Sequence, residues 1–203
     1  MTKKYLKEKW AQENIPQHII DAFFKVRREN FMPSGLKDMA YEDNAFPIGH
    51  DQTISQPTTI VNMFALLNPK LTHKVMEAGA GSGFNSAVLS KLCKHVYSLE
   101  IIPELATLAK KNIKEEKIKN VMIINADASK GYKKEAPYDR IIVTAGARSI
   151  PQVLKEQLKQ EGILVIPVGK NSQTMRRCVK EDDNLVCTDH GEYIFVEFVE
   201  NDK

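Results

Sequence analysis

The sequence predicts an α/β fold, in which a doubly wound, mostly parallel sheet of seven strands ends in an antiparallel strand pair and follows a helical N-terminal segment. Three observations carry this prediction. From residue 74 onward, short apolar runs alternate with helical segments, as in parallel strands joined by crossover helices. A glycine-rich turn, AGAGSG, follows the first of these runs. Near the C-terminus, two strand-like runs follow one another with no helix between them.

The N-terminal part of the chain, residues 1–69, is expected to be helical. In IPQHIIDAFFKVRRENF, apolar side chains recur at helical spacing from Ile15 to Val26. A second helix is expected to open at Pro57, with TTIVNMFALLN, and to close before Pro69.

Between these two helices lies a polar stretch, AFPIGHDQTISQPTTI, whose central loop is taken as residues 45–59. From Gly49 to Thr59 the only clearly apolar residue is Ile54. The stretch has neither the alternating charges of a solvated helix nor a repeat that would bury one face. Taken alone, it suits a surface connection, and the alternative is the wall of a binding site.

Seven short strands are expected, and runs such as RIIVTA and ILVIPV are apolar on both faces, as buried parallel strands should be. They are KVMEAG (74–79), HVYSLE (95–100), NVMIINAD (120–127), YDRIIVTAG (138–146), ILVIPVG (163–169), TMRRCVKE (174–181) and EYIFVEFV (192–199). The helices expected between them are FNSAVLSKLCK (84–94), PELATLAKKNIKEEK (103–117) and IPQVLKEQLKQEG (150–162). The stretch DDNLVCTDHG is expected to connect the last two strands.

Composition fits one domain over residues 1–203, since 203 residues with 42% apolar content can bury a sizeable core. Residues 70–203 would form the sheet part of that domain. The apolar runs are too short to span a membrane, and no apolar signal segment follows the start of the chain, so a cytoplasmic protein is expected. A monomer is expected as well.

Charge and cysteine content exclude further classes of protein. The formal net charge is +3, but lysines are interleaved with glutamates and lack the aromatic residues of a base-stacking surface, so no nucleic-acid partner is expected. The three cysteines, Cys93, Cys178 and Cys187, are odd in number and far apart. They are expected to be buried or idle thiols, with neither a disulfide framework nor a metal site.

The glycine turn carries Gly79, Gly81 and Gly83 between a strand and a helix, which is where nucleotide-binding folds hold their ligand. The spacing is G-x-G-x-G, whereas dinucleotide-binding turns more often have G-x-G-x-x-G. A tight turn without a ligand remains the alternative at this position.

Three acidic residues end three consecutive expected strands: Glu77, Glu100 and Asp127. A carboxylate at the tip of the second strand can accept both hydroxyls of a ribose, and one at the third can accept the amine of an adenine. Three carboxylates would repel a pyrophosphate but would attract a positively charged sulfonium and an amino group. The acids therefore favour S-adenosylmethionine over a nicotinamide dinucleotide.

Five segments together resemble the protein-L-isoaspartate O-methyltransferase family of class I S-adenosylmethionine-dependent, Rossmann-like methyltransferases. They are AYEDNAFPIGHDQTISQP, VMEAGAGSGFNSAVLS, VYSLEIIPELATLAKKNI, EAPYDRIIVTAGARSIP and LKQEGILVIPVG. The first is the most specific, because other methyltransferases with this glycine turn lack TISQP ahead of it. The resemblance implies an enzyme that methylates the α-carboxyl of L-isoaspartyl residues in damaged proteins and peptides, and so begins their repair.

The resemblance also implies roles for individual residues. Ser55 matches the family's active serine. The residues implied to contact the donor or the substrate are Gln52, Thr53, Ser55, Glu77, Gly79, Gly81, Glu100, Ile101, Asp127 and Ala128. Because a carboxylate is already ionised at neutral pH, the reaction needs placement and exclusion of water rather than a general base. His50 is therefore expected to be a loop residue facing solvent, with a base as the alternative.

The sequence departs from the family pattern at five positions. Ala126 and Ala128 stand where glycines are common, and Ala80 stands where a hydroxyl residue is frequent. Ile194 and Glu197 replace an arginine and a proline in the last expected strand. Glu197 would either repel an acidic substrate or face solvent. Three alternatives follow: methylation of a nucleic-acid nitrogen or a small molecule, a donor-binding protein without activity, and a nicotinamide dehydrogenase, which the strand-tip acids disfavour.

Overall fold

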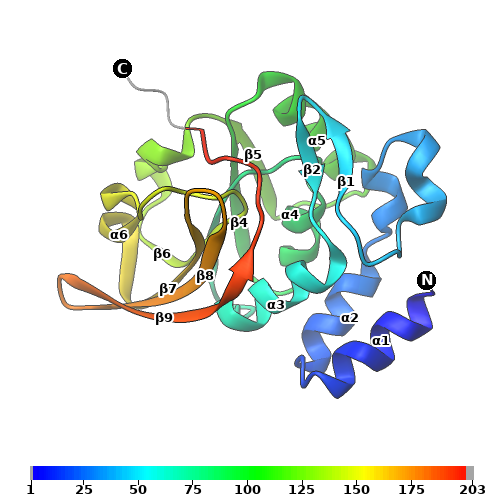
Figure 1. The fold of residues 1–203 in the computed structure, drawn as a ribbon. Coiled ribbons are helices and arrows are strands. Elements are labelled where there is room, and N and C mark those ends of the chain that lie inside the picture. Colours follow the sequence, from blue (N-terminus) through cyan, green and yellow to red (C-terminus); the bar gives the residue numbers. More distant parts are fainter. Residues whose placement is uncertain (1, 200–203) are drawn as a thin grey trace.

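The computed structural model describes residues 2–199, which form a central seven-stranded sheet with helices packed on both faces (Figure 1). The strand order is β5-β4-β3-β6-β7-β8-β9, parallel from β5 through β7 and antiparallel for β8 and β9. The bounds are β3 Lys74–Ala78, β4 His95–Glu100, β5 Val121–Asn125, β6 Tyr138–Val143, β7 Leu158–Gly169, β8 Gln173–Glu181 and β9 Asn184–Tyr193. The expected fold class is confirmed.

Two of the α-helices begin with a proline, as the sequence predicts. Pro57 and Pro103 occupy the first turns of α3 and α5, where a missing N–H costs no hydrogen bond. The α-helices are α1 Lys3–Gln12, α2 Gln17–Lys25, α3 Pro57–Leu67, α4 Phe84–Leu89, α5 Pro103–Glu115 and α6 Gln152–Gln157. Short 3₁₀ turns are η1 Arg28–Phe31, η2 Ser34–Met39, η3 Ala128–Lys130 and η4 Lys133–Glu135. Among residues 2–199, no helix has the length and apolar character needed to cross a membrane.

Side chains alternate between two apolar cores, one on each face of the sheet. On β3, Val75 belongs to the larger core, which also contains residues of α1 to α5, whereas the next residue, Met76, belongs to the smaller core under α6. The larger core reaches into the N-terminal helices through Trp10, whose ring lies edge-on to Phe23 with centroids 4.9 Å apart. The indole Nε1 also donates to Thr58 Oγ1 at 2.9 Å, which ties α1 to the start of α3.

The polar stretch forms a two-stranded hairpin of β1 Phe46–Gly49 and β2 Gln52–Ile54, outside the main sheet. Its turn places His50 and Asp51 at positive φ. The prediction of a loop was therefore incomplete. Phe46 and Ile48 alternate with exposed residues along β1, but strands of four and three residues are too short for the alternation to stand out in the sequence.

Several expected boundaries were wrong. Helix α4 ends at Leu89 and not at residue 94. Helix α6 ends at Gln157 and strand β7 already begins at Leu158, because Lys180 Nζ donates to the carbonyls of Lys155 and Leu158 and completes the helix end. Strand β9 begins at Asn184, directly after a two-residue turn, and not at residue 192. It is an exposed edge strand, so it needs no apolar run.

The expectation of idle thiols is also corrected. Cys178 and Cys187 lie opposite each other on β8 and β9 and form a disulfide, while Cys93 is a buried free thiol. Their separation in the sequence, nine residues, gave no sign that a tight hairpin would bring them together.

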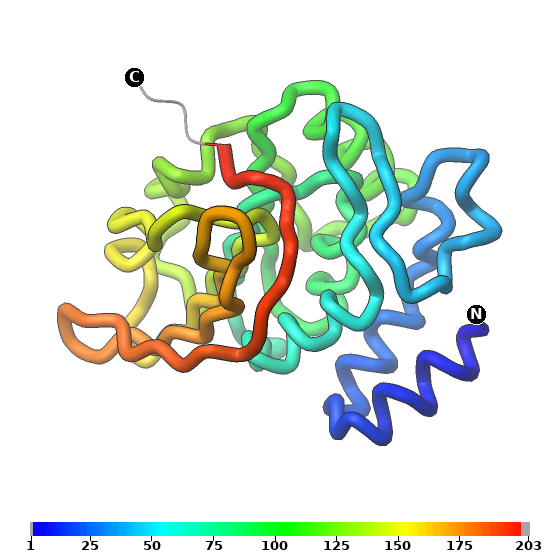
Figure 2. The backbone as a smooth tube through the Cα atoms, in the orientation of Figure 1, coloured from blue at the N-terminus to red at the C-terminus, as the bar shows by residue number. Residues whose placement is uncertain are grey.

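The last described residues, 194–199, leave the sheet and cross its edge beside the hairpin; we call them the strap (Figure 2). Gly146 holds the strap by donating to Val196 O at 2.8 Å and accepting from Phe198 N at 2.9 Å. Gln173, which is buried, accepts from Phe195 N at 2.8 Å. The expected strand over these residues is thus reduced to one isolated bridge, Gly146 with Glu197.

Candidate active site at the carboxyl edge of the sheet

A pocket opens at the carboxyl ends of the parallel strands, next to β3, which has β4 on one side and β6 on the other. Ligands bind open α/β sheets at such a point, where the crossovers run in opposite directions. The pocket and its open mouth together span about 770 Å³. Its lining comprises Gln52, Thr53, Ile54, Ser55, Gly79, Ala80, Gly81, Ser82, Phe84, Asn85, Leu99, Glu100, Ile101, Ile102, Ala128, Thr144, Ala145, Val196, Glu197, Phe198 and Val199.

The glycine turn forms the floor because only glycine fits there. Gly79 has φ of +100°, and a Cβ on it would lie 2.5 Å from Thr144 Oγ1. That hydroxyl lies 2.8 Å from Gly79 O and 3.0 Å from Ala78 O, so β6 holds the turn in place. A ligand can therefore approach the backbone of the turn closely.

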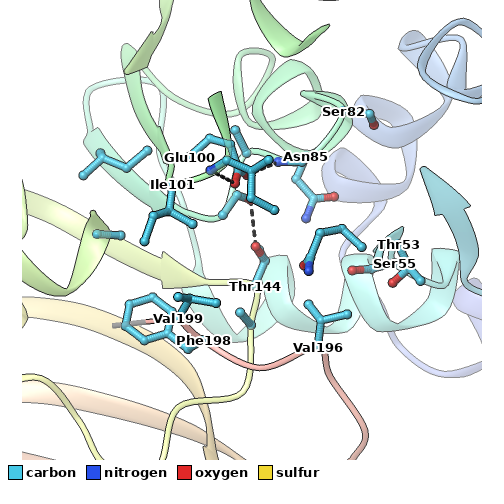
Figure 3. Close-up of a pocket in the computed structure, with 18 of the residues that line it drawn as sticks. Thr53, Ser55, Ser82, Asn85, Glu100, Ile101, Thr144, Val196, Phe198 and Val199 are labelled. Carbon is cyan, nitrogen blue, oxygen red and sulfur yellow. Dashed lines mark hydrogen bonds between the residues drawn. The ribbon is translucent and has the colours of Figure 1, made fainter. Parts of the chain in front are cut away.

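The carboxylate of Glu100 is fixed at the pocket wall by backbone donors from both sides (Figure 3). Gly81 N donates to Oε2 at 2.8 Å, and Ile102 N donates to Oε1 at 3.0 Å. Each oxygen keeps a lone pair, so the carboxylate can accept two hydroxyl groups of a ligand.

The hairpin forms the opposite wall, where Thr53 and Ser55 face the cavity (Figure 3). The strap closes the third side with Val196, Phe198 and Val199. Walls from three distant parts of the chain thus surround one cavity.

A second groove continues from the pocket between the hairpin and the strap. The two cavities share Thr53, Ser55, Thr144 and Val196. The groove is further lined by Asn44, Ala45, Gln56, Thr59, Glu192, Tyr193, Ile194 and Phe195. Ser55 therefore lies where a ligand in the pocket and a second molecule in the groove would meet.

Glu77 does not line the pocket. It is completely buried, and its Oε2 accepts hydrogen bonds from Ser86 Oγ and Ser98 Oγ. Burial raises the pKa of Glu77 to about 7, against the effect of the two hydroxyl donors, and Glu100 raises it further. Glu77 thus joins β3 to α4 and β4 inside the core.

Asp127 also lies outside the lining, although its neighbour Ala128 belongs to it. Asp127 Oδ1 accepts from Ser129 N at 2.8 Å and from Ser129 Oγ at 2.6 Å, and Oδ2 lies 3.8 Å from Lys130 Nζ. His50 is exposed at the tip of the hairpin and is not part of either cavity wall.

The structure adds residues that the sequence argument missed. Asn85 points into the pocket from the start of α4, and Thr144 stands at its centre (Figure 3). Thr144 and Ala145 follow β6 at the same sheet edge as the three acids, so the rule used for Glu100 could have found them. The apolar strap carries no comparable local signal.

The family model and the sequence relatives that match this chain all name the same enzyme family. A family model described as Protein-L-isoaspartate(D-aspartate) O-methyltransferase matches residues 2–203. The Protein-L-isoaspartate O-methyltransferase of Methanothrix thermoacetophila is 44% identical over 172 residues, which cover 83% of this chain and 82% of the relative. The relative of the same name from Dictyoglomus turgidum is 43% identical over 196 residues, which cover 96% of this chain and 89% of the relative.

Solved structures agree. One protein-L-isoaspartate O-methyltransferase superposes with a TM-score of 0.88 at 27% identity, covering 98% of this chain and 67% of the other. A Plasmodium falciparum protein in complex with S-adenosyl-L-homocysteine superposes with a TM-score of 0.86 at 23% identity, covering 99% of this chain and all of the other, and supports the fold alone.

Proposed function

Because the chain belongs to the protein-L-isoaspartate O-methyltransferase family, it transfers a methyl group from S-adenosylmethionine to the α-carboxyl of L-isoaspartyl residues, and we propose that it does so where the pocket meets the groove. The observation that carries this proposal is the position of Ser55, which lines both cavities.

The donor fits the residues of the pocket. Glu100 offers two carboxylate oxygens to a ribose, and Gly79 leaves the space that a Cβ would fill. Ile101, Ile102 and Ala128 provide an apolar surface for an adenine. When bound, S-adenosylmethionine supplies an electrophilic methyl group on a positively charged sulfur.

The other predicted donor contacts are proposed with modified roles. Gln52 and Thr53 form the wall above the donor, while Gly81 fixes Glu100 through its N–H. Asp127 is proposed to meet the adenine amine at the edge formed by Ala128. Glu77 is proposed to act indirectly, by supporting the turn.

The acceptor carboxylate needs orientation rather than deprotonation, because it is ionised at neutral pH. Ser55 is proposed to donate its hydroxyl to that carboxylate and to direct one oxygen toward the methyl group. The hairpin and the strap would exclude water and keep oxygen, carbon and sulfur in line.

The test uses two peptides that differ only in an aspartyl or isoaspartyl linkage, mixed with labelled S-adenosylmethionine. Base-labile methyl ester on the isoaspartyl peptide alone is the expected result. Label on both peptides, or on added RNA or DNA, would contradict the proposed acceptor. Binding of the donor without turnover would contradict activity.

A monomeric state and a cytoplasmic location remain proposals. Light scattering of the purified protein and fractionation of cells test them.

A further inference from the structure

Arg28, in η1, is the most deeply buried cation near the active site. Its side chain is 0% exposed and lies under two residues that line the pocket. Nη2 donates to Ser55 O at 2.8 Å, and the guanidinium carbon lies 5.1 Å from the centre of the Phe84 ring. One layer of protein therefore separates this charge from the cavity.

No carboxylate of residues 2–199 is in direct contact with this charge, and Asp43 acts on it only from a distance. Among residues 2–199, Arg28 makes no ion pair, and its buried Nε and Nη1 have no hydrogen-bond acceptor. The acids nearby are engaged elsewhere, since Glu29 accepts from Tyr41 at 2.6 Å and Asp43 accepts from Lys9 at 2.8 Å. Burial lowers the pKa of Arg28 to about 9, partly offset by Tyr41 and Asp43, so the group stays charged at neutral pH.

An uncompensated buried charge is expensive for the fold. The cavity walls supply a reason to keep it, because neither the pocket nor the groove, as far as the described residues go, contains a lysine or arginine. They do contain Glu100, Glu192 and Glu197, of which Glu197 is paired at 3.0 Å with Arg148, a residue outside both linings. An anionic acceptor would therefore enter walls with no positive side chain of their own.

We propose that Arg28 is a positioning residue that supplies the positive potential for the acceptor carboxylate, acting through the backbone of Ser55 and the ring of Phe84. This inference rests on the proposed function, which places that carboxylate at Ser55. The charge acts across a protein layer of low dielectric, where it is weakly screened.

The charge should affect binding more than chemistry. Methyl transfer consumes the negative charge of the acceptor, so an interaction with that charge is already complete before the transition state. The same positive potential disfavours the cationic sulfonium of S-adenosylmethionine but not the neutral thioether of S-adenosylhomocysteine. The ratio of the two dissociation constants therefore measures the electrostatic potential that Arg28 produces at the sulfur atom in the pocket.

The test compares Arg28→Gln, which keeps an N–H donor for Ser55 O but loses the charge, with Arg28→Lys, which keeps the charge. For Arg28→Gln we expect KM for an isoaspartyl peptide to rise about tenfold, with kcat changed less than about threefold. Binding of S-adenosylmethionine relative to S-adenosylhomocysteine should strengthen about threefold. In Arg28→Lys, assayed at pH 6 because a buried lysine loses its proton readily, both quantities should return toward wild type.

Arg140→Gln is the matched control. Arg140 is also buried, and its Nε donates to Leu67 O at 2.8 Å, but it lines neither cavity. Its loss should lower stability and leave the KM and the ratio of dissociation constants unchanged. By contrast, the melting temperature of Arg28→Gln should equal or exceed that of wild type, because a buried charge is removed.

The outcomes separate the two proposals. If the wild-type protein esterifies no isoaspartyl peptide, the proposed function fails, while the ratio of dissociation constants still reports whether the charge reaches the pocket. If wild type is active and Arg28→Gln leaves KM and the ratio within twofold, the inference is overturned. Equal weakening of both nucleosides without recovery in Arg28→Lys also overturns it. So does failure of both Arg28→Gln and Arg28→Met to fold, since Arg28 would then serve the fold alone.

Discussion

Ser55 is the residue on which the acceptor assignment depends. Replacing it with alanine should lower kcat/KM by roughly 10- to 100-fold, the value of one hydrogen bond to a charged group. Ser55 is half-buried, and no hydrogen bond of its hydroxyl to the described residues is present, so the free energy of unfolding should change by less than about 0.5 kcal/mol. Steady-state kinetics and a denaturant titration measure the two quantities.

Thr107→Ala is a suitable control, because it removes an exposed hydroxyl on α5 that lines neither cavity. It should leave kcat/KM unchanged. Wild-type kinetics in Ser55→Ala would show that Ser55 does not contact the acceptor.

Glu77 makes stability depend on pH. The folded protein holds its proton up to a pKa of about 7, whereas the unfolded chain releases it near 4.5. The folded state is therefore favoured by this group below pH 4.5, and that advantage is lost as pH rises through 7. Glu77→Gln, which stays neutral, should become more stable relative to wild type by up to about 3 kcal/mol between pH 5 and pH 8.

Melting curves of both proteins over that pH range check the sign. A stability difference that is independent of pH would mean that Glu77 is ionised throughout and that an unseen partner stabilises it. Because the comparison is a difference between two proteins, the other titrating groups cancel.

Glu77 and Glu100 also show what sequence could and could not give at this scale. Both end a strand before the pocket, so one rule predicted both as ligand contacts. Only Glu100 reaches the cavity. The carboxylate of Glu77 stays in the core, where the hydroxyls of Ser86 and Ser98 donate hydrogen bonds to it. The sequence locates an acid at a strand tip, but the hydroxyl partners that bury it come from a helix and a neighbouring strand.

At the scale of elements, prediction succeeded where residues within a helix or strand mark its start or its burial. The first turn of α5 contains Pro103, and the run Ile141–Val143 of β6 is apolar because both faces of the strand are buried there. Prediction failed for β9, because this exposed edge strand has no apolar run of its own. Its extended conformation is held by backbone pairing with β8. Prediction failed for the strap as well, since its apolar residues cover a pocket instead of extending the sheet.

The disulfide between β8 and β9 gives an element-scale prediction. A thiol reagent should find no reactive cysteine in the native protein, one after denaturation without reductant and three after reduction, because Cys93 is buried. Cys187→Ser should lower the free energy of unfolding by about 2 kcal/mol. It should leave kcat unchanged, since neither cysteine lines a cavity. A reactive thiol in the native protein would show that Cys187 is unpaired.

At the scale of the whole molecule, the site joins parts of the chain that a sequence treats as separate. The pocket takes residues from the hairpin, the glycine turn, β4, the loop after β6 and the strap. The larger apolar core extends from Leu6 in α1 to Met175 in β8, so the N-terminal helices share their packing with the sheet. We therefore expect residues 1–203 to unfold as one cooperative domain.

Trp10, the only tryptophan, tests this expectation because it is buried in α1, far along the chain from the glycine turn. Its fluorescence and the far-UV circular dichroism should report the same melting temperature. S-adenosylhomocysteine at about 100 times its dissociation constant should raise both by the same amount, about 5 to 10 °C, because a ligand that binds only the folded state adds about 2.7 kcal/mol. A fluorescence transition at lower temperature that the ligand does not shift would show that the N-terminal helices unfold independently of the sheet. The hairpin that forms one wall of the pocket would then belong to a separate folding unit.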